Sequence, residues 1–596
     1  MIFQQIKSNV IWVCIGLFFV SCLKEEMQEQ LQPNIVIILV DDQGWGDLSM
    51  NGNPLVETPR IDGIGKNGAT LQHFYVNAVC SPTRAALLTG RYAVRGGVYS
   101  TSAGGERLDL DEYTFAQAFQ EAGYATGAFG KWHNGMQYPY HPNARGFDEF
   151  FGYCSGHWGS YVDAILEHNG ELVESKGYLT DVLTHKAIEF IEANKDGPFL
   201  TYLPLNTPHS PMQVVEPWWE KFEDAELPRH RYSDREKILH SRAAYAMAEN
   251  IDGNVGRVID KLKELGIEEN TIVMYFSDNG PNGWRWNGGM EGIKGSVNEG
   301  GVRSPFVIQW PGTIKAGRQV EEITSVQDLF PTVLDLAGIN YTPKNELDGE
   351  SIAPLLLEDS TVWEDRILVN HWRNRTSIRS QGFRLDESGR LFDMQRDAGQ
   401  TSNVADSFPS VYEELQKVKE TWESEVLSEL PVEDHRSFPL GHPEYPITQL
   451  PARDGVAHGS IRRSNRWPNC SFYTNWTNLS DSITWEVEVL SAGKFEIDLL
   501  YTCQSENVGT EITLTAKNAS LAAKVTTAFD PPLRGMEYDK FERGESYVKD
   551  WATLSMGEID LEAGLQTLNL QATDIPGKGA IDFRLMMVRR VGEDSP

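Results

Sequence analysis

Apolar runs alternate with helix-like stretches from Pro33 onwards, and this alternation is the first structural signal in the chain. Residues 35–40 form an unbroken run of mainly β-branched side chains, which is typical of a strand buried on both faces of a sheet. Comparable apolar segments occur at 124–129, 199–205, 271–276 and 302–309. The pattern predicts an α/β domain in which helices cover both faces of a parallel sheet.

The pattern changes in the last quarter of the chain. Residues 431–451 are rich in proline, which favours a stiff linker. Short alternating segments follow over 452–596, with a turn at Ser491-Ala492-Gly493, and they predict an all-β sandwich. Its aromatic residues either stack on carbohydrate or form the core of a structural cap. These residues include Trp467, Tyr473, Trp476 and Trp551.

The first apolar run, residues 10–20, follows Lys7 and is too short to span a bilayer in the ordinary way. It fits the hydrophobic region of a signal peptide, with a packed N-terminal helix as the alternative. The run ends at Ser21-Cys22 and resembles a bacterial lipobox, which implies removal of residues 1–21 and lipidation of Cys22. Lys24-Glu25-Glu26 resembles a surface-export signal. We therefore expect an exported bacterial lipoprotein, anchored to the membrane by lipid, in the outer membrane, at the cell surface or in the periplasm.

The amino-acid composition excludes several classes of protein and of binding partner. The 596 residues carry a formal net charge of −32, and 40% are hydrophobic. This apolar content excludes wholesale disorder, and the length predicts about two to four domains. Nucleic acid is not expected as a partner, because its phosphates require Lys and Arg. The six cysteines include no C-x-x-C pair, so they do not indicate structural zinc.

Four predicted strands end in turns that carry polar, chemically useful side chains. The turns are Asp41-Asp42, Gly130-Lys131-Trp132-His133, Thr207-Pro208-His209-Ser210 and Ser277-Asp278-Asn279-Gly280. Each turn alone has an ordinary explanation, such as a helix cap or a tight turn. Because ligands bind beyond the carboxyl ends of parallel strands, the four turns together predict one site at one edge of the sheet.

The composition of that edge favours a hard cation beside a bound anion. The candidate oxygen ligands are Asp41, Asp42, Asp278 and Asn279. Oxygen ligands suit Ca²⁺ or Mg²⁺ and argue against zinc. Calcium is favoured because its variable ligand number suits a site assembled from separate loops. Lys131 and Lys294 would add positive charge for an oxyanion, although a solvated surface lysine is the ordinary interpretation of Lys294.

The segment Cys80-Ser81-Pro82-Thr83-Arg84, followed by Leu88-Thr89-Gly90-Arg91, is the most specific motif. It predicts a helix with Ser81 at the cap, Pro82 in the first helical position and Gly90 at its end, and Cys80 just ahead of the N-terminus, where the dipole favours negative charge. C-x-P-x-R followed by L-T-G-R resembles the signature of the formylglycine-dependent (type I) sulfatases. D-D-Q-G-W-G-D, G-K-W-H, T-P-H-S-P, S-D-N-G and G-x-K-G follow the family's order.

The resemblance implies a mechanism. A formylglycine-generating or radical sulfatase-maturing enzyme oxidises Cys80 to formylglycine, whose hydrated aldehyde attacks sulfur and also joins the calcium ligands. In this scheme His209 protonates the leaving oxygen, and His133 deprotonates the second hydroxyl so that sulfate is eliminated. The residues implied to hold the aldehyde and the sulfate are Arg84, Lys131 and Lys294.

The same resemblance implies the architecture. It predicts an alkaline-phosphatase-like catalytic domain over 33–365 and a small antiparallel α+β subdomain over 366–430. An amphipathic helix is expected from Val411 to Trp422. The sandwich would then be an accessory domain outside the resemblance.

The substrate class is inferred from the rim of the expected pocket. Aromatic and cationic residues there would bind a sulfated glycan through stacking and charge. The candidates are Trp284, Arg285, Trp286, His371 and Arg373. The surface-export signal and the extra β domain favour a sulfated polysaccharide over a small aryl sulfate. A phosphate or phosphonate ester hydrolase is one alternative, and a non-catalytic glycan-binding protein is another.

Overall fold

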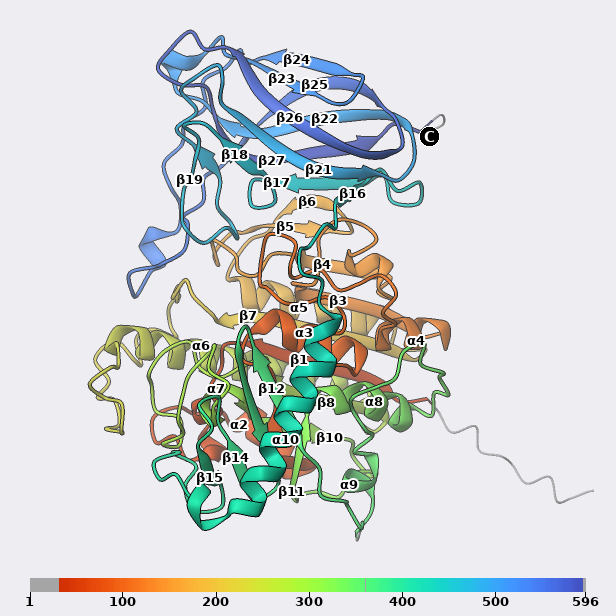
Figure 1. Cartoon of the computed structure of the whole chain (residues 1–596), viewed down its shortest axis with the longest axis vertical. Helices are drawn as coiled ribbons and strands as arrows, with labels where there is room; N and C mark the ends of the chain where they lie inside the picture. Colours follow the sequence, from red (N-terminus) through yellow and green to blue (C-terminus); the bar gives the residue numbers. More distant parts are fainter. Residues whose placement is uncertain (1–31, 360, 593–596) are drawn as a thin grey trace, which may run out of the picture.

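The computed structural model describes residues 32–359 and 361–592. The expected signal segment and Cys22 lie outside these ranges. Within them, no helix combines the length and the apolar character needed to cross a membrane. Figure 1 shows two bodies, an α/β body that contains the N-terminal two thirds and a β sandwich stacked on one end of it.

One mixed sheet of eleven strands organises the α/β body, in the order β11-β2-β10-β8-β1-β7-β3-β4-β5-β6, with β9 beside β2. The strands are β1 (Asn34–Asp41), β2 (Ala69–Tyr75), β3 (Ala125–Lys131), β4 (Glu149–Tyr153), β5 (Ile165–His168), β6 (Glu171–Glu174), β7 (Phe199–Pro208), β8 (Thr271–Ser277), β9 (Arg303–Ser304), β10 (Phe306–Gln309) and β11 (Arg318–Ser325). The helices are α2 (Pro59–Asn67), α3 (Cys80–Thr89), α4 (Phe115–Glu121), α5 (Leu179–Ala193), α6 (Ile238–Glu264), α7 (Glu299–Val302), α8 (Leu329–Ala337) and α9 (Ala353–Leu357).

Strand β1 shows why this sequence forms a two-sided core. Ile35, Ile37 and Leu39 pack in one apolar cluster with α3, α4 and α8, whereas the alternate residues Val36 and Ile38 pack in a second cluster with α2, α5 and α6. Successive strand residues point to opposite faces, so only a run that is apolar throughout can fill both cores. The predicted fold class is confirmed.

The centre of the sheet is parallel, and antiparallel pairs occur on both sides of it. Strand β1 pairs in parallel with β7 and β8, and β3 pairs in parallel with β7 and β4. Strand β10, however, runs antiparallel to both β8 and β2. The apolar segment at 302–309 therefore contributes a short antiparallel strand instead of the parallel strand that the pattern suggested. Pro305, which has no N–H to donate, separates β9 from β10.

A small subdomain follows the large sheet, as predicted. Its four-stranded antiparallel sheet has the order β12-β13-β14-β15. The elements are β12 (Leu368–Trp372), β13 (Arg375–Arg379), β14 (Phe383–Leu385), β15 (Leu391–Asp393) and α10 (Pro409–Val426). Leu415, Trp422 and Val426 of α10 pack on this sheet beside Ile378 and Leu385. In Figure 1 the helix crosses the front of the α/β body.

The C-terminal body consists of two six-stranded sheets around its own apolar core. The first contains β16 (Phe438–Leu440), β18 (Val456–His458), β21 (Ser482–Val489), β23 (Glu511–Thr515), β24 (Ser520–Lys524) and β26 (Gly564–Asp574). The second contains β17 (Ile447–Pro451), β19 (Arg462–Arg463), β20 (Tyr473–Thr474), β22 (Gly493–Thr502), β25 (Ala552–Leu561) and β27 (Asp582–Arg590).

The Pro-rich stretch at 431–451 is not simply a linker. Its strand β16 pairs with β21 and its strand β17 pairs with β27, so it supplies an outer strand to each sheet of the sandwich. Proline is compatible with an outer strand, because the N–H that it lacks can face away from the ladder. The linker prediction is therefore wrong for these residues, and the sandwich begins near Phe438.

Candidate active site

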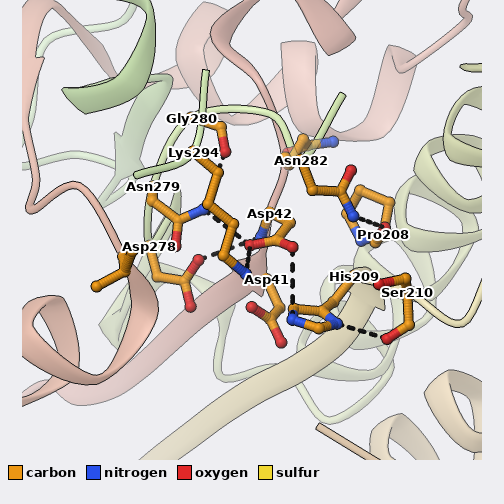
Figure 2. Close-up of polar contacts among 12 residues, drawn as sticks. Asp41, Asp42, Pro208, His209, Ser210, Asp278, Asn279, Gly280, Asn282 and Lys294 are labelled. Atoms are coloured by element: carbon orange, nitrogen blue, oxygen red, sulfur yellow. Dashed lines mark hydrogen bonds and ion pairs between the residues drawn. The ribbon is translucent and has the colours of Figure 1, made fainter. Parts of the chain in front are cut away.

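The carboxyl ends of β1 and β8 bring three carboxylates and one amide together. Val40 lies opposite Ser277 in the parallel pairing, so the residues that follow each strand are neighbours. The Asp278 amide donates to the Val40 carbonyl over 3.0 Å, and the Asp42 amide donates to Asp278 Oδ1 over 3.1 Å. Asn279 Nδ2 donates to Asp42 Oδ1 over 2.8 Å. Figure 2 shows these side chains converging from the two strand ends.

Three oxygens of this group are buried and have no hydrogen-bond partner: Asp41 Oδ1, Asp42 Oδ2 and Asn279 Oδ1. Unpartnered buried oxygens are costly unless something else satisfies them. Burial also raises the pKa of Asp41 to about 8, and the neighbouring Lys131 only partly opposes this shift. A hard divalent cation would satisfy all three oxygens and favour the ionised carboxylate, so the residues fit a calcium or magnesium ion.

Cys80 is the first residue of α3, and its side chain is buried. Its sulfur and carboxylate oxygens of Asp41 and Asp278 all lie within 4.8 Å of one another. Burial raises the pKa of the Cys80 thiol, and Lys131 and Lys294 lower it without reversing the shift. A cysteine in this environment is a poor thiolate nucleophile.

Each carboxylate of the group is paired with one cation. Arg84 Nη2 lies 2.8 Å from Asp278 Oδ2, and both side chains are fully buried. Lys131 Nζ lies 2.7 Å from Asp41 Oδ2. Lys294 Nζ lies 2.6 Å from Asp42 Oδ1. The three cations and three carboxylates therefore cancel to a formal charge of zero before any ion or substrate binds.

Two sequence-predicted histidines lie at this edge. His209 Nδ1 is 2.5 Å from the Ser210 carbonyl oxygen, and its Nε2 lies 3.6 Å from Asp42 Oδ2. His133 Nε2 is 2.9 Å from the Thr101 carbonyl oxygen, and its Nδ1 is buried without a partner. Burial holds the pKa of both imidazoles below the ordinary value, so both rings are neutral. A carbonyl can only accept, so the proton of His133 lies on Nε2 and Nδ1 is its basic nitrogen.

The residues predicted at the rim of the pocket differ in burial and in the groups that they contact. Arg285 is buried, and its guanidinium pairs with Asp47, with Nη2 2.6 Å from Oδ2. This geometry gives Arg285 a structural role instead of the substrate contact that the sequence suggested. Trp284 packs against Tyr232, with ring centroids 4.6 Å apart. Trp286 packs beside Gly46, where a β-carbon would meet its backbone and ring.

His371 and Arg373 line a cavity of about 480 Å³ beside the first turn of α3. Pro82, two residues after Cys80, lines the same cavity. Asn77, another lining residue, also contacts the first turn of α3, because its backbone amide donates to Thr83 Oγ1 over 2.9 Å. These two rim residues therefore lie next to the first turn of the helix that presents Cys80.

His157 stacks on His209 with ring centroids 5.9 Å apart. Two further residues near the site carry no sequence signal of their own. Glu545 accepts a hydrogen bond from Ser210 Oγ, and Asn469 is buried beside Thr101. Both of these come from the sandwich. Among the sandwich aromatics, Tyr473 and Trp476 are core residues and only Trp467 is well exposed, at 48%. Cys470 and Cys503 are both free thiols, so no disulfide joins them.

Comparison with known proteins identifies the family. A family model described as Sulfatase matches residues 33–339, and one described as N-sulphoglucosamine sulphohydrolase, C-terminal, matches residues 294–425. The chain belongs to the sulfatase family. Both matches end before the sandwich begins.

Individual relatives agree with this assignment. The chain is 34% identical over 362 residues to N-acetylgalactosamine-6-sulfatase from Mus musculus, over 55% of this chain and 66% of that protein, just under two thirds of its length. It is 33% identical over 387 residues to Arylsulfatase G from Mus musculus, over 56% and 70%. The crystal structure of Ps i-CgsB in complex with k-i-k-neocarrahexaose superposes with a TM-score of 0.62 at 29% identity, over 68% and 95%.

Proposed function

We propose that this protein is a sulfuric ester hydrolase that removes sulfate from a sulfated carbohydrate, using calcium and a formylglycine derived from Cys80. The observation that carries the proposal is the convergence of Cys80, Asp41 and Asp278 within 4.8 Å at the N-terminus of α3. A helix N-terminus favours negative charge, which suits a sulfate group.

Asp41, Asp42, Asp278, Asn279 and the modified residue 80 would hold the cation. Bound there, calcium would supply positive charge that offsets the charge on the sulfuryl oxygens. Arg84 keeps Asp278 in place through two contacts, because its Nε and Nη2 both donate to Asp278 Oδ2, over 3.2 and 2.8 Å. Its Nη1 also donates to the Lys131 carbonyl over 2.6 Å, which ties the Asp278 and Lys131 loops together.

The position of Cys80 supports its modification. The buried thiol has a raised pKa and is a weak nucleophile, whereas a formylglycine at the same position would supply a hydrated aldehyde. Lys131 and Lys294 are the cations whose charges act on the Cys80 sulfur. They are therefore placed to stabilise negative charge at position 80 and on the transferred group. We include a formylglycine-generating or radical sulfatase-maturing enzyme as a required partner.

The two histidines have complementary arrangements for moving protons. His209 donates from Nδ1 to the Ser210 carbonyl, and the Asp42 carboxylate that faces Nε2 raises the pKa of the ring, so a second proton taken up at Nε2 would be stabilised there and placed for donation to a leaving oxygen. His133 donates from Nε2 to a backbone carbonyl and keeps Nδ1 free to accept a proton. His209 therefore acts as the acid and His133 as the base.

Charge pairing favours sulfate over phosphate. Three cations are neutralised by three carboxylates, so one divalent ion would supply about two positive charges. Negative charge on the nucleophile at position 80 would offset about one of them, which leaves about one for the transferred group. A sulfate monoester carries one negative charge and a phosphate monoester up to two. Two-metal phosphatases provide more compensating charge for their substrates. The site therefore suits transfer of the monoanionic group.

A sulfated glycan is the proposed substrate, and the relatives support this class. N-acetylgalactosamine-6-sulfatase is named for a sulfated sugar, and the Ps i-CgsB structure is a complex with a neocarrahexaose. His371 and Arg373 in the cavity beside α3, and Trp284 and Trp286 near the carboxylate edge, are our proposed sugar contacts. We also propose export as a lipoprotein through Cys22.

The test is sulfate release from a panel of sulfated oligosaccharides and from matched sulfate and phosphate esters of one alcohol. The protein is made with and without a maturation enzyme, and peptide mass spectrometry reads the state of residue 80. We expect turnover only in the matured protein, a higher kcat/KM for sulfate than for phosphate, and no turnover in Cys80→Ala. Full activity of the unmodified thiol would reject the mechanism. A phosphate preference would place the protein among the phosphate or phosphonate ester hydrolases, and binding without turnover would indicate a glycan-binding protein.

A further inference from the structure

The sandwich contacts the α/β body at the histidine side of the active site. Its 534–548 segment descends along that body, where the Lys540 amide donates to the Met212 carbonyl over 2.9 Å and Arg543 Nη1 donates to the Gly159 carbonyl over 2.8 Å. In Figure 1 this is the blue loop that hangs below the sandwich on its left. The segment includes Glu545, which contacts Ser210, the residue after His209. The docking surface therefore includes residues adjacent to the catalytic histidine.

A second sandwich loop, residues 465–471, reaches the other two histidines. Asn469 is buried, and its Nδ2 lies 3.4 Å from the Thr101 carbonyl oxygen. The same carbonyl oxygen accepts the hydrogen bond from His133 Nε2 over 2.9 Å. A β-carbon on Gly156 would lie 2.5 Å from both Asn469 Nδ2 and His133 Nε2, so these two nitrogens flank one glycine. Cys470 Sγ donates to the His157 carbonyl over 2.8 Å.

The side chain of Arg453 fixes the orientation of the Asn469 amide. Arg453 Nη1 donates to Asn469 Oδ1 over 3.1 Å, which leaves the Nδ2 group facing Thr101. Arg453 is itself buried, and its Nη2 lies 3.3 Å from Glu106 Oε1 of the catalytic domain. A continuous polar chain therefore runs from Glu106 through Arg453 and Asn469 to the carbonyl that binds His133.

We propose that the sandwich completes the active site and that Asn469 is a positioning residue for His133. By donating to the Thr101 carbonyl, Asn469 holds that oxygen where it accepts the proton of His133 Nε2. The proton is thereby kept on Nε2, and Nδ1 remains the basic nitrogen. The ring of a catalytic histidine is commonly held by the hydrogen bond of its second nitrogen. Here the partner of that bond is held by a different domain. The role in turnover rests on the proposed function, whereas the effect on the imidazole does not.

The variant Asn469→Asp isolates the donor. It keeps the side-chain volume and the oxygen that faces Arg453, and replaces the Nδ2 donor with an oxygen that repels the Thr101 carbonyl. Asn465→Asp is the matched control, because Asn465 Nδ2 donates to the Gly544 carbonyl within the sandwich over 2.9 Å. In the full-length matured protein with a small aryl sulfate, we expect Asn469→Asp to lower kcat on the order of 100-fold with KM changed less than about threefold. Asn465→Asp should leave both constants within about twofold.

A spectroscopic readout separates this proposal from the proposed function. The ¹⁵N shifts of His133, assigned by comparison with His133→Gln, report which ring nitrogen carries the proton. We expect the Nε2–H form in the wild type and a shift toward a mixture in Asn469→Asp, whether or not the protein hydrolyses sulfate. Asn469→Ser, which is too short to reach Thr101, should behave in the same way and serves if the aspartate variant does not fold. Wild-type kcat and an unchanged His133 signature in a folded variant would overturn the proposal. An inactive wild type with the expected shifts would reject only the proposed function.

Discussion

Two regions of this protein, the carboxyl edge of the large sheet and the core of the sandwich, fill their interiors in opposite ways. The edge of the α/β sheet buries charge, with Arg84 against Asp278 and Lys131 against Asp41, all four side chains fully enclosed. The core of the sandwich buries aromatic and aliphatic side chains such as Trp485, Phe495 and Phe583. Buried ion pairs stabilise little beyond their desolvation cost but are strongly destabilising when one partner is removed. Apolar packing contributes stability directly and carries no chemistry. The sheet edge therefore carries the candidate chemistry, whereas the sandwich core contributes to the stability of the fold.

The largest effect is expected where a buried pair also serves the chemistry. Asp278→Asn removes the charge that pairs with Arg84 and one carboxylate of the cation site. We expect turnover to fall on the order of 1,000-fold or more, because charge stabilisation and nucleophile placement are lost together. Calcium affinity, measured by titration calorimetry, should fall in parallel. Unchanged calcium binding in a folded Asp278→Asn protein would contradict the assignment of Asp278 as a ligand.

A buried pair that lies behind the site should affect stability more than chemistry. Asp47→Ala leaves the buried Arg285 without its carboxylate, and we expect a loss of about 3–5 kcal/mol in the free energy of unfolding. Replacing both partners, Asp47→Leu with Arg285→Met, should recover much of this loss, because neither charge then remains buried. Denaturant titrations of the two single variants and the double variant measure the coupling. Additive losses would show that the pair is not the source of the effect.

A substitution in the sandwich core tests whether apolar packing there contributes to stability without affecting catalysis. Trp485 is buried in the core of the sandwich, edge-on to Phe583 with ring centroids 5.6 Å apart. Trp485→Ala should cost about 3 kcal/mol through lost packing and a cavity, and should leave kcat of the folded protein within about twofold. Thermal unfolding with activity measured below the transition checks both. A large fall in kcat without unfolding would show that core packing, and not only loop placement, governs the site.

The smallest effect is expected from a histidine between the two bodies. His240 of α6 packs edge-on against Phe541 of the sandwich, with ring centroids 5.4 Å apart. Burial lowers its pKa from 6.5 to about 4, with Arg285 adding to the shift. Between these values the unfolded chain binds a proton that the folded protein does not. The free energy of unfolding should therefore be fully present above pH 6.5 and decrease as the pH falls toward 4. His240→Leu should flatten this part of the curve in denaturant titrations, whereas an unchanged slope would exclude His240 as its source.

Much of the carboxylate edge could be anticipated because it depends on strand ends. The polar pairs Asp41-Asp42 and Asp278-Asn279 each follow an apolar run, and parallel neighbouring strands place their carboxyl ends at the same edge. The helix that begins at Cys80 was also predictable, since Pro82 and Gly90 mark its first turn and its end. Local sequence signals of this kind are sufficient to predict a site where the fold class already determines which strands are neighbours.

The residues that sequence reasoning placed wrongly or did not name depend on contacts between distant segments. Arg285 is a cationic residue of the kind expected at the rim of the pocket, but its guanidinium donates to Asp47, which lies 238 positions earlier in the chain. Strands β16 and β17 lie in a Pro-rich stretch whose pairing partners are β21 and β27, far along the chain. Asn469 stands in no motif, and it meets Thr101 across 368 positions.

The sequence by itself determined the two-sided core of β1, the polar turns after β1, β3, β7 and β8, and the helix that carries Cys80. These follow from periodicity and from the chemistry of adjacent residues, which act over a few positions. The tertiary structure alone decided which charges pair, which rim residues remain free, and that the sandwich docks against the histidines. Those outcomes depend on the relative placement of separately formed bodies, and no local pattern encodes the distance between Asn469 and the carbonyl that holds His133.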